Sequence, residues 1–555
     1  MNSIFEELGI SQSTLALGKE AEKSVRPIFD KIDETAFKNH LRVQKAFYDA
    51  RISTVHFAAS SGYGLNDEAR EAADKVYALA FGAEAAIVRP NFVSGTHTLS
   101  CMLFAALRPG DTMLAATGEP YDTLHGVIRG EKGSLSSFGI NYKEVPLKDG
   151  APDREGIRAA LSDKTIKVVW IQRSKGYVFR PTLSVHEIGE LAEFIKSVRS
   201  DVYVFCDNCY GEFAEEREPV SLGVDLMGGS LIKNPGGGLA QSGGYIAGRE
   251  ELVEMAADAL TAPGLGMESG CNFGMSKSIL QGFYMAPHTV AQAMKTAVFC
   301  SSLMQKLGFD VSPLPDEPRA DIIEAVRLGS PEMVEAFCQG IQLGSPVDSF
   351  VTPVPSGMPG YGDEVIMAAG TFTQGASIEI TADAPMREPY VVYMQGALSY
   401  ESGKTAVLVE RVISRLTDKV SPVSADRLLI VTFTNAAAAE MRTRIEKRLD
   451  GECRKSPDVI GLLKQKRLLG SAKICTIDSF CIDLVRENFE KTGVSPDFKM
   501  SDGYSLLPVN ESVLSDILNR YYEEGNPDFF KLLDTVGAEY DDGDFSDFVL
   551  DIYEY

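Results

Sequence analysis

Residues 228–238, GGSLIKNPGGG, place a single lysine between a short apolar run and a turn rich in glycine. Lys233 follows two apolar residues that are typical of a buried strand, and it precedes an Asn-Pro pair and three glycines. Such glycines let a backbone turn closely around a bound ring. An amine removed from water has a lowered pKa and forms imines readily. The plainer interpretation is a surface lysine at the end of a strand, and this stretch alone leaves both open.

The residues around this stretch predict an α/β domain. Short apolar or β-branched runs alternate with helical stretches, which is the pattern of a mostly parallel sheet covered by helices. Ligands of such sheets gather at the carboxyl ends of the strands. The expected strands are EAAIVRP (84–90), DTMLAA (111–116), NYKEVPL (141–147), KVVWIQRS (167–174), VYVFCDN (202–208), GGSLIKN (228–234) and GGYIAG (243–248).

The chain is too long for one compact core, so several domains are expected from its 555 residues. A long helical stretch over 276–307 leaves the sheet and leads into shorter, mixed elements. We expect four parts, which are an N-terminal helical arm (1–45), a large domain (46–285), a small domain (286–402) and a segment of different character (403–555).

Composition limits the classes of partner. The formal net charge of −24 argues against a chain that binds nucleic acid or anionic membranes over its whole surface. No apolar run is long enough to span a bilayer, and the first residues lack the features of a signal peptide, so we expect a cytoplasmic protein. Cys206 and Cys209 form a CxxC without a second pair or a nearby histidine, so no metal site is expected.

A carboxylate precedes Lys233 at the end of another expected strand. Asp207 ends the run VYVFCD, where a buried carboxylate is costly unless a cation pairs with it. A protonated pyridine nitrogen is such a cation. The alternative for Asp207 is an ordinary helix N-cap.

Two further strand ends carry side chains suited to a phosphorylated ring. Ser94, Gly95 and Thr96 lie between an expected strand and a helical stretch, and phosphate dianions bind at helix N-termini. Tyr121 follows the next strand and is placed to stack on a pyridine ring. An ordinary cap explains Ser94 equally well, and a packing tyrosine is the common alternative for Tyr121.

An amine, an acid, phosphate donors and an aromatic ring are what pyridoxal 5'-phosphate (PLP) requires of a protein. One motif matches easily by chance, whereas the four in this order at strand ends of one domain match far less easily. The sequence therefore predicts a PLP site.

Seven stretches carry a resemblance to a known family. The chain resembles the methionine gamma-lyase-like proteins known as aluminium resistance proteins, which are relatives of cystathionine lyases, from its N-terminus to about Ser402. The stretches are SSGYGLNDEAR (60–70), RPNFVSGTHT (89–98), GEPYDTLHG (118–126), IQRSKGY (171–177), CDNCYGEF (206–213), SLIKNPGGG (230–238) and ITADAPMREPY (380–390).

This resemblance implies a PLP enzyme of fold type I, the aspartate-aminotransferase-like fold with a large and a small domain, assembled as a homodimer or homotetramer. It implies β- or γ-elimination from a sulfur-containing amino acid, which releases ammonia and a keto acid. The residues do not distinguish among the sulfur amino acids. The resemblance implies that Lys233 forms the Schiff base and shuttles protons, and that Asp207 pairs with the pyridine nitrogen. It implies that Ser94, Gly95 and Thr96 bind the phosphate, that Tyr121 stacks on the ring and protonates the leaving group, and that Tyr63 reaches the phosphate of a neighbouring subunit. Arg387 is the candidate that binds the substrate carboxylate, with Arg173 as its rival.

The residues after Ser402 resemble a different family. SGKTAVLVERV (402–412), RLLIVTFTNAAAAEMRTRI (427–445) and KICTIDSFC (473–481) are similar to the N-terminal part of a UvrD-like helicase, the A subunit of the bacterial ATP-dependent helicase/nuclease (AddA). The resemblance implies that Gly403, Lys404 and Thr405 cradle nucleotide phosphates, with ATP and DNA as partners. This P-loop, helicase-like α/β segment gives the rival function, an ATP-dependent DNA motor.

The helicase-like pattern is incomplete. Leu398 stands where a phosphate loop has glycine, and Glu401 would repel a triphosphate. No later motor motif is recognisable, so helicase ATPase activity is not expected. The alternative for Lys404 is a lysine in a helix. The stretch SGKTAVL suits both the end of the lyase and the start of the helicase, so we expect a fusion joined at this overlap, natural or an artefact of assembly.

Overall fold

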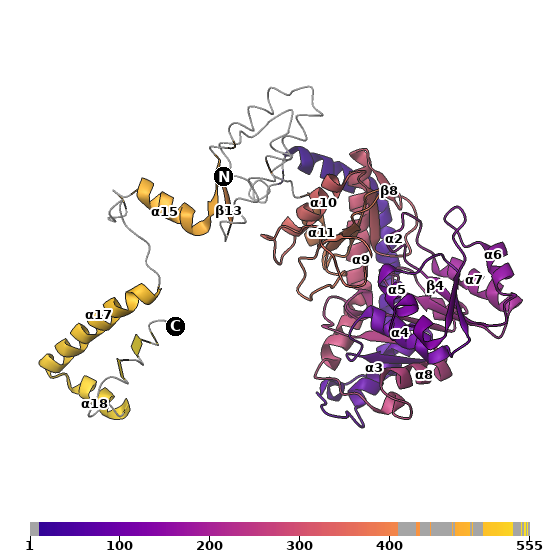
Figure 1. Cartoon of the computed structure of the whole chain (residues 1–555), viewed down its shortest axis with the longest axis horizontal. Helices are drawn as coiled ribbons and strands as arrows, with labels where there is room; N and C mark the ends of the chain where they lie inside the picture. The colour runs from indigo at the N-terminus through magenta and orange to yellow at the C-terminus, as the bar shows by residue number, and fades with distance from the viewer. Residues whose placement is uncertain are drawn as a thin grey trace, which may run out of the picture. The chain divides into compact units, whose positions relative to one another are not determined.

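The computed structural model describes residue 10 and residues 12–408, 429–432, 445, 469, 472–488, 491, 503–536, 545–546, 549–550 and 552. The chain divides into two compact units, Met1–Val412 and Ile413–Tyr555. Figure 1 shows their helices and strands. None of the helices in these described ranges is long and apolar enough to cross a membrane.

A seven-stranded sheet forms the centre of the first unit, in the order β1-β7-β6-β5-β4-β2-β3. β7 runs antiparallel to β1 and β6, and the other neighbouring pairs are parallel. All seven expected strands are present, but β6 is shifted and ends three residues before Lys233. The strands are β1 (Ala85–Arg89), β2 (Thr112–Ala115), β3 (Asn141–Glu144), β4 (Ile166–Gln172), β5 (Tyr203–Asp207), β6 (Leu226–Ser230) and β7 (Gly244–Gly248).

Both faces of this sheet are buried, which explains the nearly continuous apolar runs of its strands. In β4, Val168 and Trp170 face one core, and Val169 and Ile171 face the other. The first core lies under α4 (Gly95–Ala106), α5 (Asp122–Arg129) and α8 (Glu250–Leu260). The second core lies under α3 (Glu68–Phe81), α6 (Arg154–Ala160), α7 (Val185–Val198) and α9 (Ser276–Lys306). Short 3-10 helices are η1 (Thr54–Phe57), η2 (Ser136–Phe138), η3 (Pro219–Leu222), η4 (Asn234–Gly236) and η5 (Gly266–Glu268).

Two long helices connect the parts of this unit. α2 (Gln12–Asp49) packs along α9, and Figure 1 shows the two side by side. The predicted helix of 276–307 is confirmed, and that of the arm is confirmed from Gln12 onward, since residues 1–9 and 11 lie outside the described residues. The expected boundaries after residues 45, 285 and 402 fall inside α2, α9 and α11 (Tyr400–Leu408). Continuous helices thus join the arm, the large domain and the small domain.

The small domain is an antiparallel sheet in the order β10-β11-β12-β9-β8. One face packs against α10 (Pro331–Leu343) and α11. The other face carries Tyr393 and Val391, which pack with Tyr177 of the large domain. This second face therefore turns toward the carboxyl ends of the large-domain strands. The strands are β8 (Asp310–Ser312), β9 (Ile323–Arg327), β10 (Val365–Ala368), β11 (Thr381–Pro385) and β12 (Val391–Gln395).

The second unit contains a parallel pair, β13 (Leu429–Thr432) and β14 (Lys473–Thr476). Thr476 caps α15 (Ile477–Glu487) by accepting a hydrogen bond from the backbone of Ser479 at 3.2 Å. Two further helices are α17 (Gly503–Glu524) and α18 (Pro527–Val536). Most of the helicase-like stretch VTFTNAAAAEM lies outside the described residues.

Candidate active site

The strand directions bring four sequence-predicted residues to one edge of the large sheet. β1, β2, β5 and β6 point the same way, because β7 alone is antiparallel. Ser94, Tyr121, Asp207 and Lys233 follow or end these strands. The common edge is where open α/β sheets bind ligands.

The turn that carries Lys233 is fixed from both sides. Lys233 precedes η4, and the side-chain amide of Asn234 donates to the backbone carbonyls of Tyr210 (2.9 Å) and Glu212 (3.0 Å). A Cβ on Gly237 would lie 2.3 Å from the carbonyl oxygen of Gly282 in α9. Close packing against α9 therefore requires a glycine at this position.

The electrostatic environment of Lys233 differs from our expectation. Its Nζ lies 4.0 Å from the centroid of the Tyr210 ring. Burial alone would lower the pKa of Lys233, but Cys209 and Tyr210 raise it, and Asp207 acts in the same direction. The pKa of Lys233 is therefore above its usual value. The expected lowering is not confirmed, because neighbouring groups, the carboxylate of Asp207 among them, oppose the effect of burial.

Asp207 is the last residue of β5 and is buried. Its Oδ1 accepts a hydrogen bond from the backbone N–H of Cys209 at 3.1 Å. Burial raises the pKa of Asp207, while the charge of Lys233 lowers it, and the net shift is upward. A turn follows β5 here, so Asp207 is not the helix N-cap of the alternative interpretation.

The N-terminus of α4 packs against the ends of two strands. Ser94 is its N-cap and accepts a hydrogen bond from the backbone N–H of His97 at 3.0 Å. A Cβ on Gly95 would lie 3.4 Å from that of Ser230, at the end of β6, and 4.0 Å from the sulfur of Cys209. This close approach places the N-terminus of α4 next to the end of β6 and the turn after β5, an arrangement that suits a phosphate.

Tyr121 and Thr96 are joined through the start of α5. The Tyr121 backbone N–H donates to Gln172 Oε1 at 2.6 Å, and the hydroxyl oxygens of Thr96 and Thr123 lie 2.8 Å apart. Burial raises the pKa of the Tyr121 phenol well above its usual value. The phenol therefore keeps its proton at neutral pH.

Two expected site residues lie at the margin. The Arg387 guanidinium lies 2.7 Å from Asp363 and 3.9 Å from Asp122, the first residue of α5. Because Asp122 directly follows Tyr121 in the sequence, this contact brings Arg387 close to the start of α5. The side chain of Tyr63 is 80% exposed in the loop after η1, so within the described part of the first unit it stands apart from this buried cluster.

Arg173 is paired with other residues of the protein and does not face the candidate site as a free cation. It is fully buried, and its guanidinium lies 2.8 Å from Glu215, 3.4 Å from Glu218 and 2.7 Å from Asn208 Oδ1. Carboxylates of the protein already neutralise its charge. This geometry favours a role in holding the turn after Asp207 and leaves Arg387 as the better placed of the two arginines.

The Gly-Lys-Thr sequence forms no loop. Gly403, Lys404 and Thr405 lie inside α11, and Lys404 Nζ is 2.6 Å from Glu22 Oε2 in α2. A Cβ on Gly403 would lie 2.3 Å from Thr296 Oγ1 in α9. A phosphate loop needs free backbone N–H groups after a strand, so the geometry agrees with the alternative of a lysine in a helix.

Sequence reasoning missed four residues of the cluster. Tyr177 and Tyr210 stand within the strand-end motifs IQRSKGY and CDNCYGEF, so their positions after strands were a usable signal. Tyr361 and Asp383 come from the small domain. Asp383 stands within the stretch ITADAPMREPY (380–390), whereas no local pattern marks Tyr361. The hydroxyls of Tyr121 and Tyr361 are 2.8 Å apart, and Tyr177 donates a hydrogen bond to Asp383.

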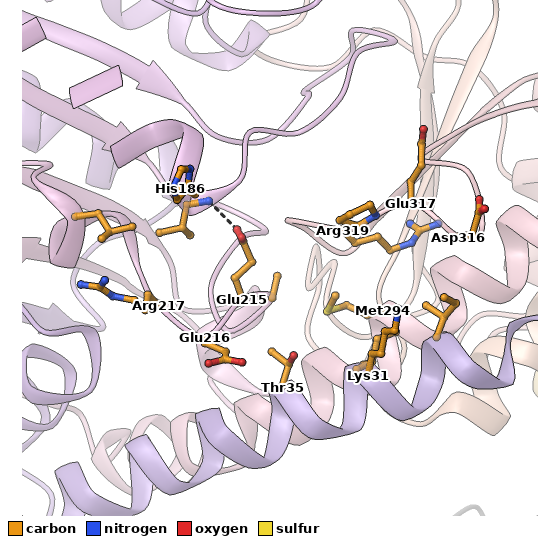
Figure 2. Close-up of a pocket in the computed structure, with 16 residues that line it drawn as sticks. Lys31, Thr35, His186, Glu215, Glu216, Arg217, Met294, Asp316, Glu317 and Arg319 are labelled. Atoms are coloured by element: carbon orange, nitrogen blue, oxygen red, sulfur yellow. Dashed lines mark hydrogen bonds between the residues drawn. The ribbon is translucent and has the colours of Figure 1, made fainter. Parts of the chain in front are cut away.

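A separate cavity of about 540 Å³ opens between α2, the start of α7 and the loop 316–319, as Figure 2 shows. Charged side chains of both signs line it, including Lys31, Glu216 and Arg217. Its lining contains neither Lys233 nor Asp207. We therefore do not assign the candidate site to this cavity.

The comparison with protein families decides the relationship of the first unit. The family model of methionine gamma-lyase matches residues 14–417. The chain belongs to the methionine gamma-lyase family. The protein YnbB of Bacillus subtilis (strain 168) is 47% identical over 409 residues, which are 73% of this chain and 97% of that relative.

Solved structures share this fold. A carbon-sulfur lyase involved in aluminium resistance from Clostridium novyi is 45% identical with a TM-score of 0.70, over 73% of this chain and 97% of that one. A cystathionine beta-lyase candidate involved in aluminium resistance from Clostridium acetobutylicum is 48% identical with a TM-score of 0.71, over the same shares of both chains.

The second family resemblance is also confirmed. The N-terminal domain model of the UvrD/REP helicases matches residues 400–536. The A subunit of the ATP-dependent helicase/nuclease of Acetivibrio thermocellus is 42% identical over 154 residues, which are 28% of this chain but 12% of that relative. The chain thus spans about an eighth of that relative's length, and the match begins inside α11.

Proposed function

We propose that the first unit is a PLP-dependent carbon-sulfur lyase that acts on a sulfur-containing amino acid by β- or γ-elimination. The observation that carries this proposal is the meeting of Lys233, Asp207 and the α4 N-terminus at one edge of the sheet. The family membership supports the reaction class.

The residues at this edge fit the cofactor. Lys233 would hold the cofactor through its amine, and Asp207 would place a buried carboxylate at the pyridine nitrogen. Ser94, Gly95 and Thr96 supply hydroxyl and backbone donors for the phosphate. Gly95 has no side chain at the point where this helix end comes close to Ser230 and Cys209. Bound PLP supplies an electron-withdrawing ring for the charge left on the α-carbon.

Three side chains act on the substrate, and each has a different role. The Lys233 amine removes the α-proton of the substrate. Tyr121, whose phenol is protonated at neutral pH, donates a proton to the departing sulfur. Arg387 holds the substrate carboxylate, which replaces Asp363 as its partner. Water then releases ammonia and a keto acid.

We also propose that the working form is a homo-oligomer in which Tyr63 reaches the phosphate in a neighbouring copy. Exposed apolar side chains support this proposal, because Leu65, Val93 and Phe273 are each more than half exposed. Large exposed apolar groups mark interaction surfaces.

The test replaces the lysine. Lys233→Ala removes the imine nitrogen, so we expect loss of the visible absorbance of the lysine-bound cofactor and loss of keto acid release from cysteine, cystathionine, homocysteine and methionine. Lys132→Ala, at an exposed position, is the matched control and should keep both properties. Full activity in the Lys233 variant would contradict the assignment.

The helicase-like segment gives a second candidate function, ATP-dependent DNA unwinding. We do not propose it for this chain, because Lys404 lies inside α11 and pairs with Glu22 of α2.

A further inference from the structure

A loop of the small domain lies against the start of α5. The 356–365 loop, SGMPGYGDEV, is closed by two backbone hydrogen bonds between Ser356 and Val365, at 3.0 and 3.1 Å. It lies between α10 and β10, far from Tyr121 in the sequence. Closure at its base limits the positions that the loop can adopt.

Three neighbouring residues of the 356–365 loop reach α5. A Cβ on Gly360, which has a φ of +89°, would lie 3.4 Å from the Thr123 side chain. Tyr361 shares its hydrogen bond with Tyr121. Asp363 holds Arg387, which also faces Asp122. The loop therefore lies against the start of α5 at Tyr121 and Thr123.

Aromatic packing fixes the Tyr361 ring. Its centroid lies 5.9 Å from that of Tyr177, which in turn lies 5.4 Å from that of Tyr121. Tyr177 donates a hydrogen bond to the buried Asp383, and Gln395 donates to the same carboxylate at 2.6 Å. These contacts hold the Tyr361 ring beside Tyr121 and Tyr177, with its hydroxyl 2.8 Å from that of Tyr121.

We propose that Tyr361 is a positioning residue for Tyr121, orienting its phenol toward the departing sulfur. This inference rests on the proposed function. When Tyr361 donates to the Tyr121 oxygen, the Tyr121 proton points away from Tyr361 and toward the substrate. The carbon-sulfur bond breaks with its electron pair on sulfur, the proton passes from Tyr121 to sulfur, and the Tyr361 hydroxyl stabilises the phenolate that remains.

The test compares leaving groups that differ in their need for a proton. S-alkyl cysteines release a basic thiolate, whereas S-(nitrophenyl)cysteine releases a weakly basic one. Tyr361→Phe should lower kcat for the S-alkyl substrates about tenfold or more, since a hydrogen bond to a charged oxygen is lost. It should leave kcat for the nitrophenyl substrate and KM for both nearly unchanged.

Tyr393→Phe is the matched control, because the Tyr393 ring also packs on Tyr177, at 5.4 Å, but lies outside the Tyr121–Tyr361 pair. Tyr393→Phe should have the same kcat as the parent chain for both substrates. An equal loss on both substrates in Tyr361→Phe, or no loss, would overturn the inference. A parent chain without cofactor absorbance would instead contradict the proposed function.

A second measurement needs no turnover. In the full chain, the thermal midpoints of Tyr121→Phe, Tyr361→Phe and the double variant form a cycle. If the two hydroxyls bond to each other, the double variant should shift less than the sum of the single shifts. Additive shifts would show that the pair does not interact and would overturn the inference.

Discussion

Glu212 shows how one buried acid links stability to pH. It is fully buried, and Tyr245 donates a hydrogen bond to its Oε1 at 2.7 Å. Burial raises the pKa of Glu212 from 4.5 to about 8. Between these values the folded chain holds a proton that the unfolded chain has released. Stability from this residue is therefore present at low pH and declines as the pH rises toward 8.

Glu212→Gln should remove this decline, because glutamine resembles the protonated acid and does not titrate. We expect the parent chain to lose more free energy of unfolding than the variant between pH 5 and pH 9, by about 1.4 kcal/mol for each unit of the pKa shift. Denaturant unfolding at both pH values measures the difference. Glu193→Gln, at an exposed position, is the control, and parallel pH profiles for parent and Glu212→Gln would contradict the prediction.

At the scale of elements, the stretch SGKTAVL (402–408), which is shared by the two family resemblances, forms part of one helix, α11. Gly403 and Lys404 hold α11 against α9 and α2. Gly403→Ala places a Cβ into Thr296, so overpacking should destabilise the chain by about 1–3 kcal/mol. Gly126→Ala in α5 is the control, because a Cβ there meets open space. Thermal unfolding compares the two, and an unchanged midpoint for Gly403→Ala would contradict the packing.

The same helix predicts how the chain responds to nucleotide. A ligand that binds the folded state raises the thermal midpoint. Because Lys404 lies in α11 and pairs with Glu22, we expect millimolar ATP with magnesium to leave the midpoint of the full chain unchanged. Lys404→Ala should lower the midpoint slightly and equally with or without ATP. An increase with ATP that disappears in Lys404→Ala would restore the motor interpretation.

At the scale of the whole molecule, the two units predict separable behaviour. Every residue of the proposed site and the cores around the two sheets of the first unit lie before residue 413. A chain of residues 1–412 should therefore keep the cofactor absorbance, the lyase activity and a thermal midpoint close to that of the full chain. A shortened chain that folds but loses the cofactor would show that the second unit contributes to the site.

The sequence alone determined the strands, the long helices and four residues of the proposed site. Short apolar runs that alternate with helical stretches predict strands buried on both faces, and the carboxyl ends of parallel strands in one α/β domain meet at one edge. Ser94, Tyr121, Asp207 and Lys233 were found in this way. These features are local or follow from the topology, so they can be recognised without coordinates.

Only the tertiary structure decided which of the remaining side chains meet. Tyr361 and Asp383 reach the large domain because the small sheet turns one face toward it. Arg173 and Lys233 are both basic residues, but their surroundings decide what each does, since carboxylates surround the first and neighbouring groups oppose the lowering of the pKa that burial causes at the second. Electrostatic energies depend on distances between residues far apart in the chain, and a local pattern does not contain those distances.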